Sequence, residues 1–162
     1  MKVEGERLLE APREVVWTIL NDPAEMAELM PGVQSFEVRD DTHWSAKVKI
    51  PLGLGSLAMA IDFEKTEERE LEFASLHAKG HGVGAMLNMQ TSFTLEPAEE
   101  HTRMLWAADV SIAGPVGSMG QRVLQPIVKQ QVNLVLTALD KRVAVARSPE
   151  AKSAGDGAGP AV

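Results

Sequence analysis

The residues of this chain that could do chemistry are first of all its histidines. His77 and His81 are spaced i, i+4, which on a helix could present two ring nitrogens to one metal ion. They lie, however, in a segment that alternates with a period of two, and four residues of an extended strand span roughly 13 Å. Two side chains so far apart cannot bind one ion, so we expect no metal site.

His77 has two further interpretations. It shares its parity in the predicted strand with Leu71 and Phe73, so it could point into a pocket and donate a hydrogen bond to a carbonyl oxygen of a ligand. The alternative is a histidine at the end of a strand, in water. The sequence leaves both open.

Carboxylates form the second group of candidates, because paired carboxylates can act as general acid and general base. The closely spaced glutamates are Glu4, Glu6, Glu10, Glu64, Glu67, Glu68, Glu70 and Glu72. They fall on the water-facing parity of the predicted strands or at hairpin tips, which is typical of a solvated surface. We therefore interpret them as surface charge.

Other catalytic patterns are also missing from the sequence. The glycine-rich segment 80–84 is not followed by a helix, which a dinucleotide-binding loop requires. The chain has 0 cysteines, and no set of serine, histidine and carboxylate suited to nucleophilic catalysis converges. We predict no catalytic residue and no cofactor.

The predicted elements begin with a strand at 2–9 and two short helices at 11–20 and 24–29. Pro12 stands early in the first helix, where its missing N–H is harmless, and Pro23 separates the two helices. From 33 to about 113 the apolar residues alternate with a period of two, with turn signals between the runs. One-sided alternation indicates antiparallel strands with one wet face and one dry face.

A long helix after Gly114 and Pro115 should cover the dry face. Apolar residues recur there at helical spacing, namely at Val116, Met119, Val123, Ile127 and Leu134, with Leu124, Val128, Val135 and Leu139 as neighbouring members of the same pattern. Pro126 removes a backbone hydrogen bond and should kink this helix in its first third. The sequence thus predicts an α+β domain, a seven-stranded curved antiparallel sheet around a long C-terminal helix, with two short helices after strand 1.

An apolar pocket, rather than a fully packed core, is expected between sheet and helix. The chain has 8 methionines, and because methionine is flexible and polarizable, a methionine-rich cavity adapts to a bulky guest. For any single methionine, simple core filling is the open alternative. The predicted pocket residues are Leu57, Met59, Ile61, Phe63, Phe73, His77, Met89, Thr91, Phe93, Met104, Trp106, Met119, Val123 and Ile127. Arg7 would enter the pocket floor or lie at a water-accessible edge.

Composition limits the partners and the location. With 16 basic and 23 acidic residues the net charge is −7, which argues against a nucleic-acid footprint or a polybasic membrane patch. No run approaches the roughly 20 apolar residues of a membrane span, and the lack of cysteine suits a reducing compartment, so we expect a cytoplasmic protein. Residues 1–146 should form the folded domain and 147–162 a disordered polar tail.

The order of predicted elements resembles the helix-grip fold of the START-like (SRPBCC, Bet v1-like) superfamily over about residues 1–145. The runs A-P-R-E-V-V-W at 11–17, L-N-D-P at 20–23 and M-P-G at 30–32 are similar to the N-terminal signature of the CoxG family of carbon monoxide dehydrogenase subunits. Gly117, Gly120 and Arg122 at the start of the last helix narrow the resemblance to CoxG-like proteins. Two departures are Val33, where many relatives have a cysteine, and the polar tail at 148–162, where some carry an apolar anchor.

The resemblance implies binding of a lipophilic molecule such as a quinone or lipid, association with a carbon monoxide dehydrogenase-type molybdenum hydroxylase, or a role in placing that enzyme at the inner face of the membrane through transient contact. Our leading hypothesis is a noncatalytic binding protein that serves such an enzyme as an accessory carrier or docking factor. Relatives of this fold include aromatase/cyclases, so a polyketide cyclase-like enzyme using the same pocket is one alternative. A ligand-free assembly factor is another.

Overall fold

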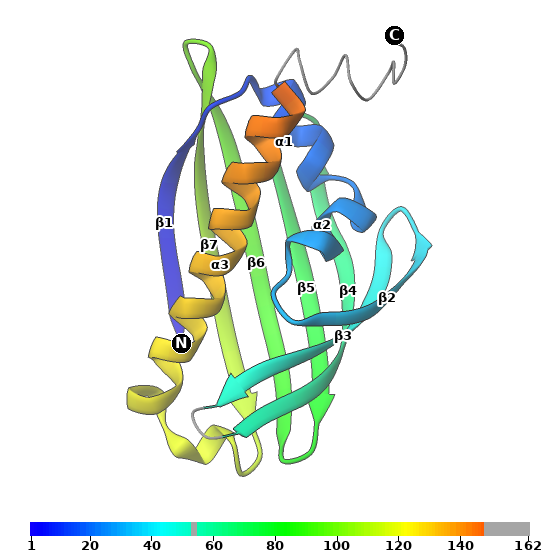
Figure 1. Ribbon diagram of the computed structural model, residues 1–162, viewed down its shortest axis with the longest axis vertical. Helices are drawn as coiled ribbons and strands as arrows, with labels where there is room; N and C mark the ends of the chain where they lie inside the picture. The colour runs from blue at the N-terminus through cyan, green and yellow to red at the C-terminus, as the bar shows by residue number, and fades with distance from the viewer. Residues whose placement is uncertain (53–54, 148–162) are drawn as a thin grey trace, which may run out of the picture.

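The computed structural model describes residues 1–52 and 55–147 and has a curved sheet wrapped around one long helix (Figure 1). The predicted disordered tail lies outside these residues except for Arg147, which still belongs to the helix.

The elements follow the predicted order. They are β1 (Lys2–Leu9), α1 (Arg13–Leu20), α2 (Pro23–Leu29), β2 (Val33–Asp40), β3 (His43–Leu52), β4 (Gly55–Arg69), β5 (Phe73–Gly82), β6 (Ala85–Ala98), β7 (His101–Ala113), the 3-10 turn η1 (Gly117–Met119) and α3 (Gln121–Arg147). The predicted α+β helix-grip class is confirmed.

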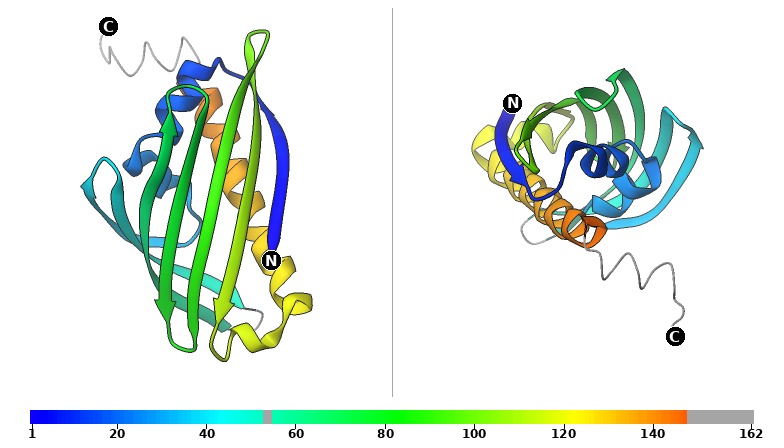
Figure 2. Two further views of the ribbon diagram at one scale, coloured as in Figure 1. Left: turned by 180° about the vertical axis from the view of Figure 1, so that it is seen from behind. Right: turned by 90° about the horizontal axis from the view of Figure 1, so that it is seen from above.

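All seven strands form one antiparallel sheet in the order β1-β7-β6-β5-β4-β3-β2. Seen from above, the sheet curls around α3, with α1 and α2 closing one end of the space between them (Figure 2). Apolar residues alternate with exposed ones along the strands, as in β4, where Leu57, Met59, Ile61 and Phe63 are buried. One face of the sheet is therefore dry and faces the helix.

The short helices owe their ends to local side-chain chemistry. Asp22 caps α2 by accepting a hydrogen bond from the backbone N–H of Ala24 at 2.9 Å, and Pro23 occupies the first helical turn. After α2, Gly32 adopts a φ of +74°, and a Cβ built there would lie 2.2 Å from the carbonyl oxygen of Lys49. Only glycine fits this close approach, which explains the Pro-Gly pair of the signature.

Helix α3 turns only part of the predicted apolar set toward the sheet. Its buried residues are Leu124 and Leu139, which belong to that set, and Leu136 and Val143, which do not. Val123 is 44% exposed and Leu134 46% exposed. Because α3 carries apolar residues on more than one side, its periodicity alone does not determine which side packs.

Two ion pairs attach the C-terminal half of α3 to the rest of the fold. Arg7 of β1 pairs with Asp140, and the Nε atom of Arg142 donates to Oε1 of Glu25 in α2 at 2.9 Å. Hydrogen bonding to these carboxylates raises the pKa of each guanidinium. Arg7 thus lies at a half-buried edge against the helix, and it is not among the residues that line the cavity described below.

Candidate ligand-binding site

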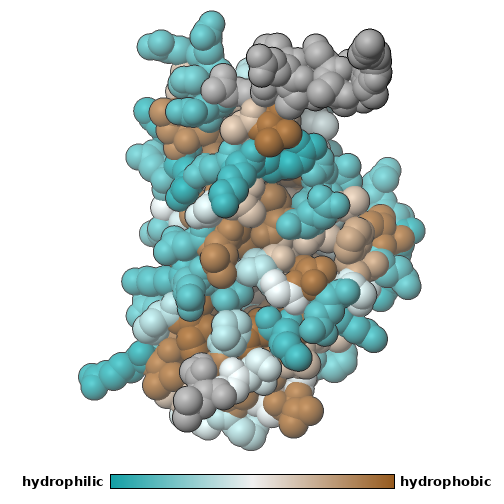
Figure 3. Space-filling model, viewed as in Figure 1, coloured by the Kyte–Doolittle hydropathy of each residue, from teal (hydrophilic) through white to brown (hydrophobic). Residues whose placement is uncertain are grey.

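An apolar cavity of about 330 Å³ lies between the dry face of the sheet and α3. Its volume falls at the lower end of the range of roughly 300–1,000 Å³ that small-molecule sites occupy. On the face shown in Figure 3, apolar surface is visible in the region between α3 and α2. The cavity is the candidate site.

Most of the predicted pocket residues lie in the wall of this cavity. They are Leu57, Met59, Ile61, Phe63, Met89, Thr91, Phe93, Met104, Trp106 and Ile127. All but the last come from β4, β6 and β7, where large apolar residues alternate with polar ones, so that hydrophobicity alone identifies the inner face.

Phe73 and His77 are corrections, because β5 turns them away from the cavity. The buried residues of this strand are Ala74, Leu76, Ala78 and Gly80, on the opposite parity. The Nε2 atom of His77 lies 2.8 Å from Oδ1 of Asn88, outside the cavity lining. The sequence misled here because the inward positions beside Phe73 and His77 are filled by the small residues Ala74 and Ala78, so hydrophobicity favoured the wrong parity.

Met119 and Val123 are also corrections. Both are 44% exposed and neither lines the cavity. Met119 belongs to η1, which ends before α3 begins, so the helical spacing assumed through 116–134 is interrupted at Gly120. Leu124, Val128 and Val135, which the helical pattern also included, line the cavity together with Val132.

The short helices and β3 supply wall residues that the predicted set omitted. They are Leu20, Met26, Leu29, Met30, Trp44, Val48, Ile50 and Leu52. Trp44 stacks on Phe63 with ring centroids 5.5 Å apart and an interplanar angle of 9°. The alternation of β3 could have identified Trp44 and Val48, whereas no local pattern places α1 and α2 over the sheet.

The wall is almost without polar groups. Among the described residues that line it, the polar side chains besides the tryptophans are Thr91, Ser92 and Gln131, and none is charged. The indole N–H groups of Trp44 and Trp106 are buried and have no acceptor in the described part of the chain. The cavity can therefore hold an apolar guest, but it presents no group that could act as a general acid or base near pH 7.

A second hollow, of about 580 Å³, lies on the opposite face of the sheet and is more open. Asp62, Lys79, Asn88 and Ser111, which neighbour one another across four strands, contribute to its lining. It is an open groove on the surface, with the charged residues Asp62 and Lys79 in its wall, so we do not regard it as the ligand site.

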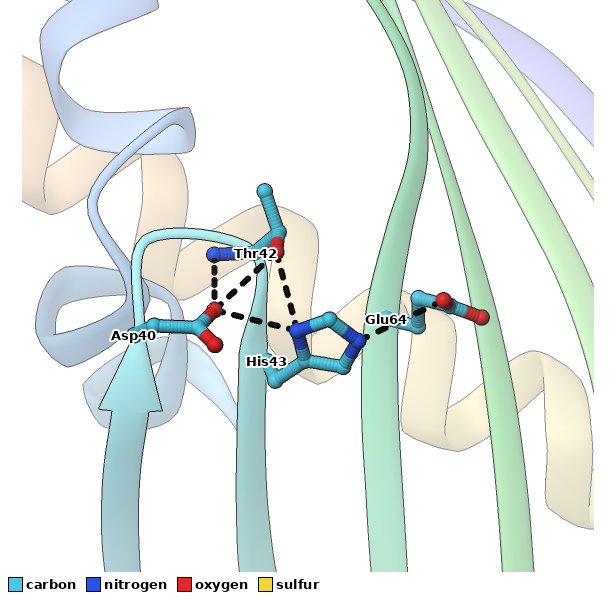
Figure 4. Close-up of polar contacts among 4 residues, drawn as sticks. All are labelled: Asp40, Thr42, His43 and Glu64. Atoms are coloured by element: carbon cyan, nitrogen blue, oxygen red, sulfur yellow. Dashed lines mark hydrogen bonds and ion pairs between the residues drawn. The ribbon is translucent and has the colours of Figure 1, made fainter.

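A compact cluster of titratable groups that includes a histidine lies at the β2–β3 turn (Figure 4). Nδ1 of His43 lies 3.0 Å from Asp40 and its Nε2 lies 3.3 Å from Glu64. The backbone N–H of Thr42 and the ring of His43 lower the pKa of Asp40 to about 2, and the hydrogen bond with Asp40 raises the pKa of His43. Since His43 faces away from the buried Trp44, this cluster contributes to the hairpin and not to the cavity.

Comparison with known proteins identifies the family. The family model for CoxG, a subunit of carbon monoxide dehydrogenase, matches residues 5–144. The chain belongs to the CoxG family. No curated protein matches this CoxG-family chain.

Solved structures share the helix-grip fold of this CoxG-family protein. A conserved protein from Geobacillus kaustophilus has a TM-score of 0.82 at 22% identity, with 89% of this chain and 95% of that chain covered. A START superfamily protein from Mycobacterium smegmatis has a TM-score of 0.69 at 14% identity, covering 88% and 97%. The Zhui aromatase/cyclase from Streptomyces sp. R1128 has a TM-score of 0.65 at 15% identity, covering 99% of each chain. At these identities the likeness shows the fold alone.

Two further properties of the described residues bear on other functions. No group of three or more histidine, cysteine, aspartate or glutamate side chains in this part of the chain could hold a metal ion. None of the described helices combines the length and the apolar character needed to cross a bilayer.

Proposed function

We propose that this CoxG-family protein binds an uncharged lipophilic molecule, of the size of a quinone or a lipid, and leaves it chemically unchanged. The observation that carries the proposal is the wall of the cavity, whose described residues include methionines, aromatic residues and aliphatic residues from the sheet and from α3 but no charged side chain. Burial of apolar surface provides about 25 cal/mol for each Å² removed from water. A ligand that fills this cavity gains its affinity in that way.

The ligand should be uncharged in the part that enters. A carboxylate or phosphate transferred into an apolar site without a partner loses its hydration, which costs several kcal/mol after relaxation. Arg7 is the cation that the sequence suggested for the pocket floor. It is paired with Asp140 and does not line the cavity, so it is not placed to neutralise a ligand's charge. A fatty acid anion is therefore a poor ligand, whereas a quinone or a neutral lipid chain suits the wall.

Binding is favoured over catalysis for a related reason. A cyclase needs a placed acid or base beside the reacting chain, and the hydroxyl groups of Thr91 and Ser92 have no basic side chain next to them among the residues that line the cavity. Cyclase activity is the alternative function, because the fold is similar to that of an aromatase/cyclase.

We further propose that the protein serves a carbon monoxide dehydrogenase-type molybdenum hydroxylase as a carrier or docking factor. Membership of the CoxG family supports this proposal. Copurification of such an enzyme with the tagged full chain tests the partnership. Copurification without any ligand in the cavity would instead favour an assembly factor.

Ligand binding is tested with two variants of α3. Val132 lines the cavity and Leu134 is exposed on the same helix, so Val132→Phe reduces the cavity while Leu134→Phe adds the same group outside it. We expect decylubiquinone and a short-chain menaquinone to raise the Tm of the parent and of Leu134→Phe, and to raise that of Val132→Phe much less. Native mass spectrometry of the purified protein should detect a bound apolar molecule in the same two proteins.

The opposite results contradict the proposal. If neither quinone nor a neutral lipid shifts the Tm of the parent, and no small molecule travels with the native protein, the cavity is not a binding site for such ligands. Equal shifts in Val132→Phe and Leu134→Phe would place binding elsewhere.

A further inference from the structure

Gln131 is the polar side chain that α3 contributes to the cavity wall, as far as the described residues show. The positions three, four and seven residues away from it, which surround it on the helix, are all apolar. They are Leu124, Ile127, Val128, Leu134, Val135 and Ala138. A helix face that is turned to water is polar at such positions. Gln131 is therefore a polar group within an apolar face and not part of a solvated one.

The side-chain amide of Gln131 is free to bind another molecule. In the described part of the chain it takes part in no hydrogen bond, and its nitrogen and oxygen are not among the enclosed polar atoms. A glutamine amide has two N–H donors and a carbonyl oxygen with two lone pairs. Burying such a group in an apolar wall costs free energy unless a partner satisfies it. Gln131 can thus offer a donor and an acceptor to a molecule in the cavity.

The two ion pairs of α3 show which way Gln131 faces. Asp140 pairs with Arg7 of β1, and Arg142 pairs with Glu25 of α2, so the two pairs mark opposite flanks of the helix. At about 100° per residue, Gln131 lies about 20° from Arg142 and about 180° from Asp140 around the helix axis. Gln131 therefore lies on the flank that faces α2, roughly three turns from the Arg142 pair.

The cavity reaches the surface on this flank. Met26 of α2, Ile50 of β3 and Val135 of α3 all line it and are only partly buried. The apolar surface between the two helices in Figure 3 lies on the same side. The mouth of the cavity is therefore between α2 and α3, and Gln131 stands on its α3 side.

We infer that Gln131 binds the oxygen-bearing end of the lipophilic ligand at this mouth, while the apolar remainder lies against the sheet. The inference rests on the proposed function and narrows the ligand to molecules that carry a neutral oxygen at one end. A carbonyl oxygen accepts from the amide N–H, and a hydroxyl group donates to the amide oxygen. Gln131 therefore holds a quinone and the corresponding quinol with similar affinity.

The neutrality of the amide is what permits both forms. A carboxylate in this place would accept from a quinol but repel a quinone carbonyl, and an ammonium group has no acceptor for a quinol hydroxyl. Thr91 is the rival position for the ligand's oxygen, because its hydroxyl also donates and accepts. It lies within β6, between Leu76 of β5 and Ala108 of β7, on the sheet side of the cavity.

The test is isothermal titration of the full chain with decylubiquinone and, under argon, with decylubiquinol. We expect the parent to bind both forms. Gln131→Leu should weaken both by about five-fold, which corresponds to one neutral hydrogen bond of about 1 kcal/mol. Gln131→Glu at pH 8 should shift the preference toward the quinol by at least about ten-fold, because it exchanges the donor for an anionic acceptor.

Gln130 provides the matched control. It is the same residue type, next to Gln131 in the same helix, but it is exposed and does not line the cavity. Gln130→Leu and Gln130→Glu should therefore bind both forms as the parent does. Thr91→Val should also bind as the parent does, because the inference places the ligand's oxygen at the mouth.

The outcomes separate this inference from the proposed function. If the parent binds neither form, both fail. If the parent binds both forms but Gln131→Leu binds them as tightly as Gln130→Leu, only the role of Gln131 is overturned, and a loss in Thr91→Val would place the oxygen at the sheet. An unchanged preference between quinone and quinol in Gln131→Glu also overturns the role of Gln131, because a merely structural effect would weaken both forms alike.

Discussion

Arg7 in β1 and Asp140 in α3, which are 133 residues apart in the chain, form an ion pair through two guanidinium nitrogens, with Nε 3.1 Å from Oδ2. Their side chains are 34% and 40% exposed, so solvent screens the pair in part. The pair joins the first strand to the last helix, beside the Glu25–Arg142 pair that joins α2 to the same helix. The C-terminal half of α3 is thus fixed on two sides.

Asp140→Ala should lower the free energy of unfolding by about 1 kcal/mol, a value at the upper end for partly exposed pairs because both nitrogens donate. It should also speed hydrogen exchange in the last turns of α3. Urea denaturation and exchange measured by mass spectrometry check both effects. Glu4→Ala, which removes the exposed pair with Lys2, is the control and should change neither. Unchanged exchange in α3 would mean that packing alone holds the helix.

Gly32→Ala should destabilise the protein by at least about 2 kcal/mol. The substitution places a side chain at a φ of +74° and a Cβ 2.2 Å from a backbone oxygen, so both strain and displacement follow. Gly55→Ala is the matched control, because no heavy atom lies within 4 Å of a Cβ at that position. Thermal melts of the two variants should differ clearly. Equal melting temperatures would mean that the turn after α2 relaxes without cost.

The His43 cluster predicts a pH dependence of stability. Because the pKa of folded His43 is raised above the ordinary 6.5, its charged form stabilises the fold below that pH, and the contribution is lost as the pH rises through the folded pKa. Asp40, with a pKa of about 2, acts in the opposite sense and loses its contribution only as the pH falls from 3.8 toward that value.

His43→Gln should therefore melt below the parent near pH 5.5 and approach it at pH 8 and above. Melting curves across pH 5–9 measure this difference. His81→Gln, a change at an exposed strand end, should show no such convergence. A constant difference between His43→Gln and the parent at all pH values would show that the ring matters for packing and not for charge.

Pro126→Ala tests whether the first part of α3 governs ligand exchange. Pro126 lies inside the helix and cannot donate to the carbonyl oxygen four residues earlier, and no ion pair is found in the described residues between 121 and 139. Alanine restores the backbone N–H donor at position 126, which should raise the free energy of unfolding. Alanine also makes the unfolded chain more flexible, and after this loss is subtracted we expect a net gain of about 2 kcal/mol. It should also slow the release of a fluorescent quinone analogue. If Pro126→Ala releases the analogue at the parent's rate and its Tm is no higher, the first part of α3 does not control the release of ligand.

The sequence by itself determined the order and type of the elements. Period-two alternation with turn signals predicts the strands, because a pleated strand between water and a core exposes every second side chain, as in β4 from Leu57 to Phe63. Pro23 and the Pro31-Gly32 pair mark the ends of α2 through local backbone chemistry. These signals depend on neighbours in the chain, so they can be read without the fold.

The tertiary structure alone decided which faces meet. In β5 the inward positions are filled by Ala74 and Ala78, and the outward position of His77 follows from the pairing with β4 and β6, not from its own hydrophobicity. In α3 two apolar stripes compete, and the sheet selects the one that contains Val132. Packing, pairing and charge placement involve residues distant in sequence, and their outcome is fixed only when the whole chain is folded.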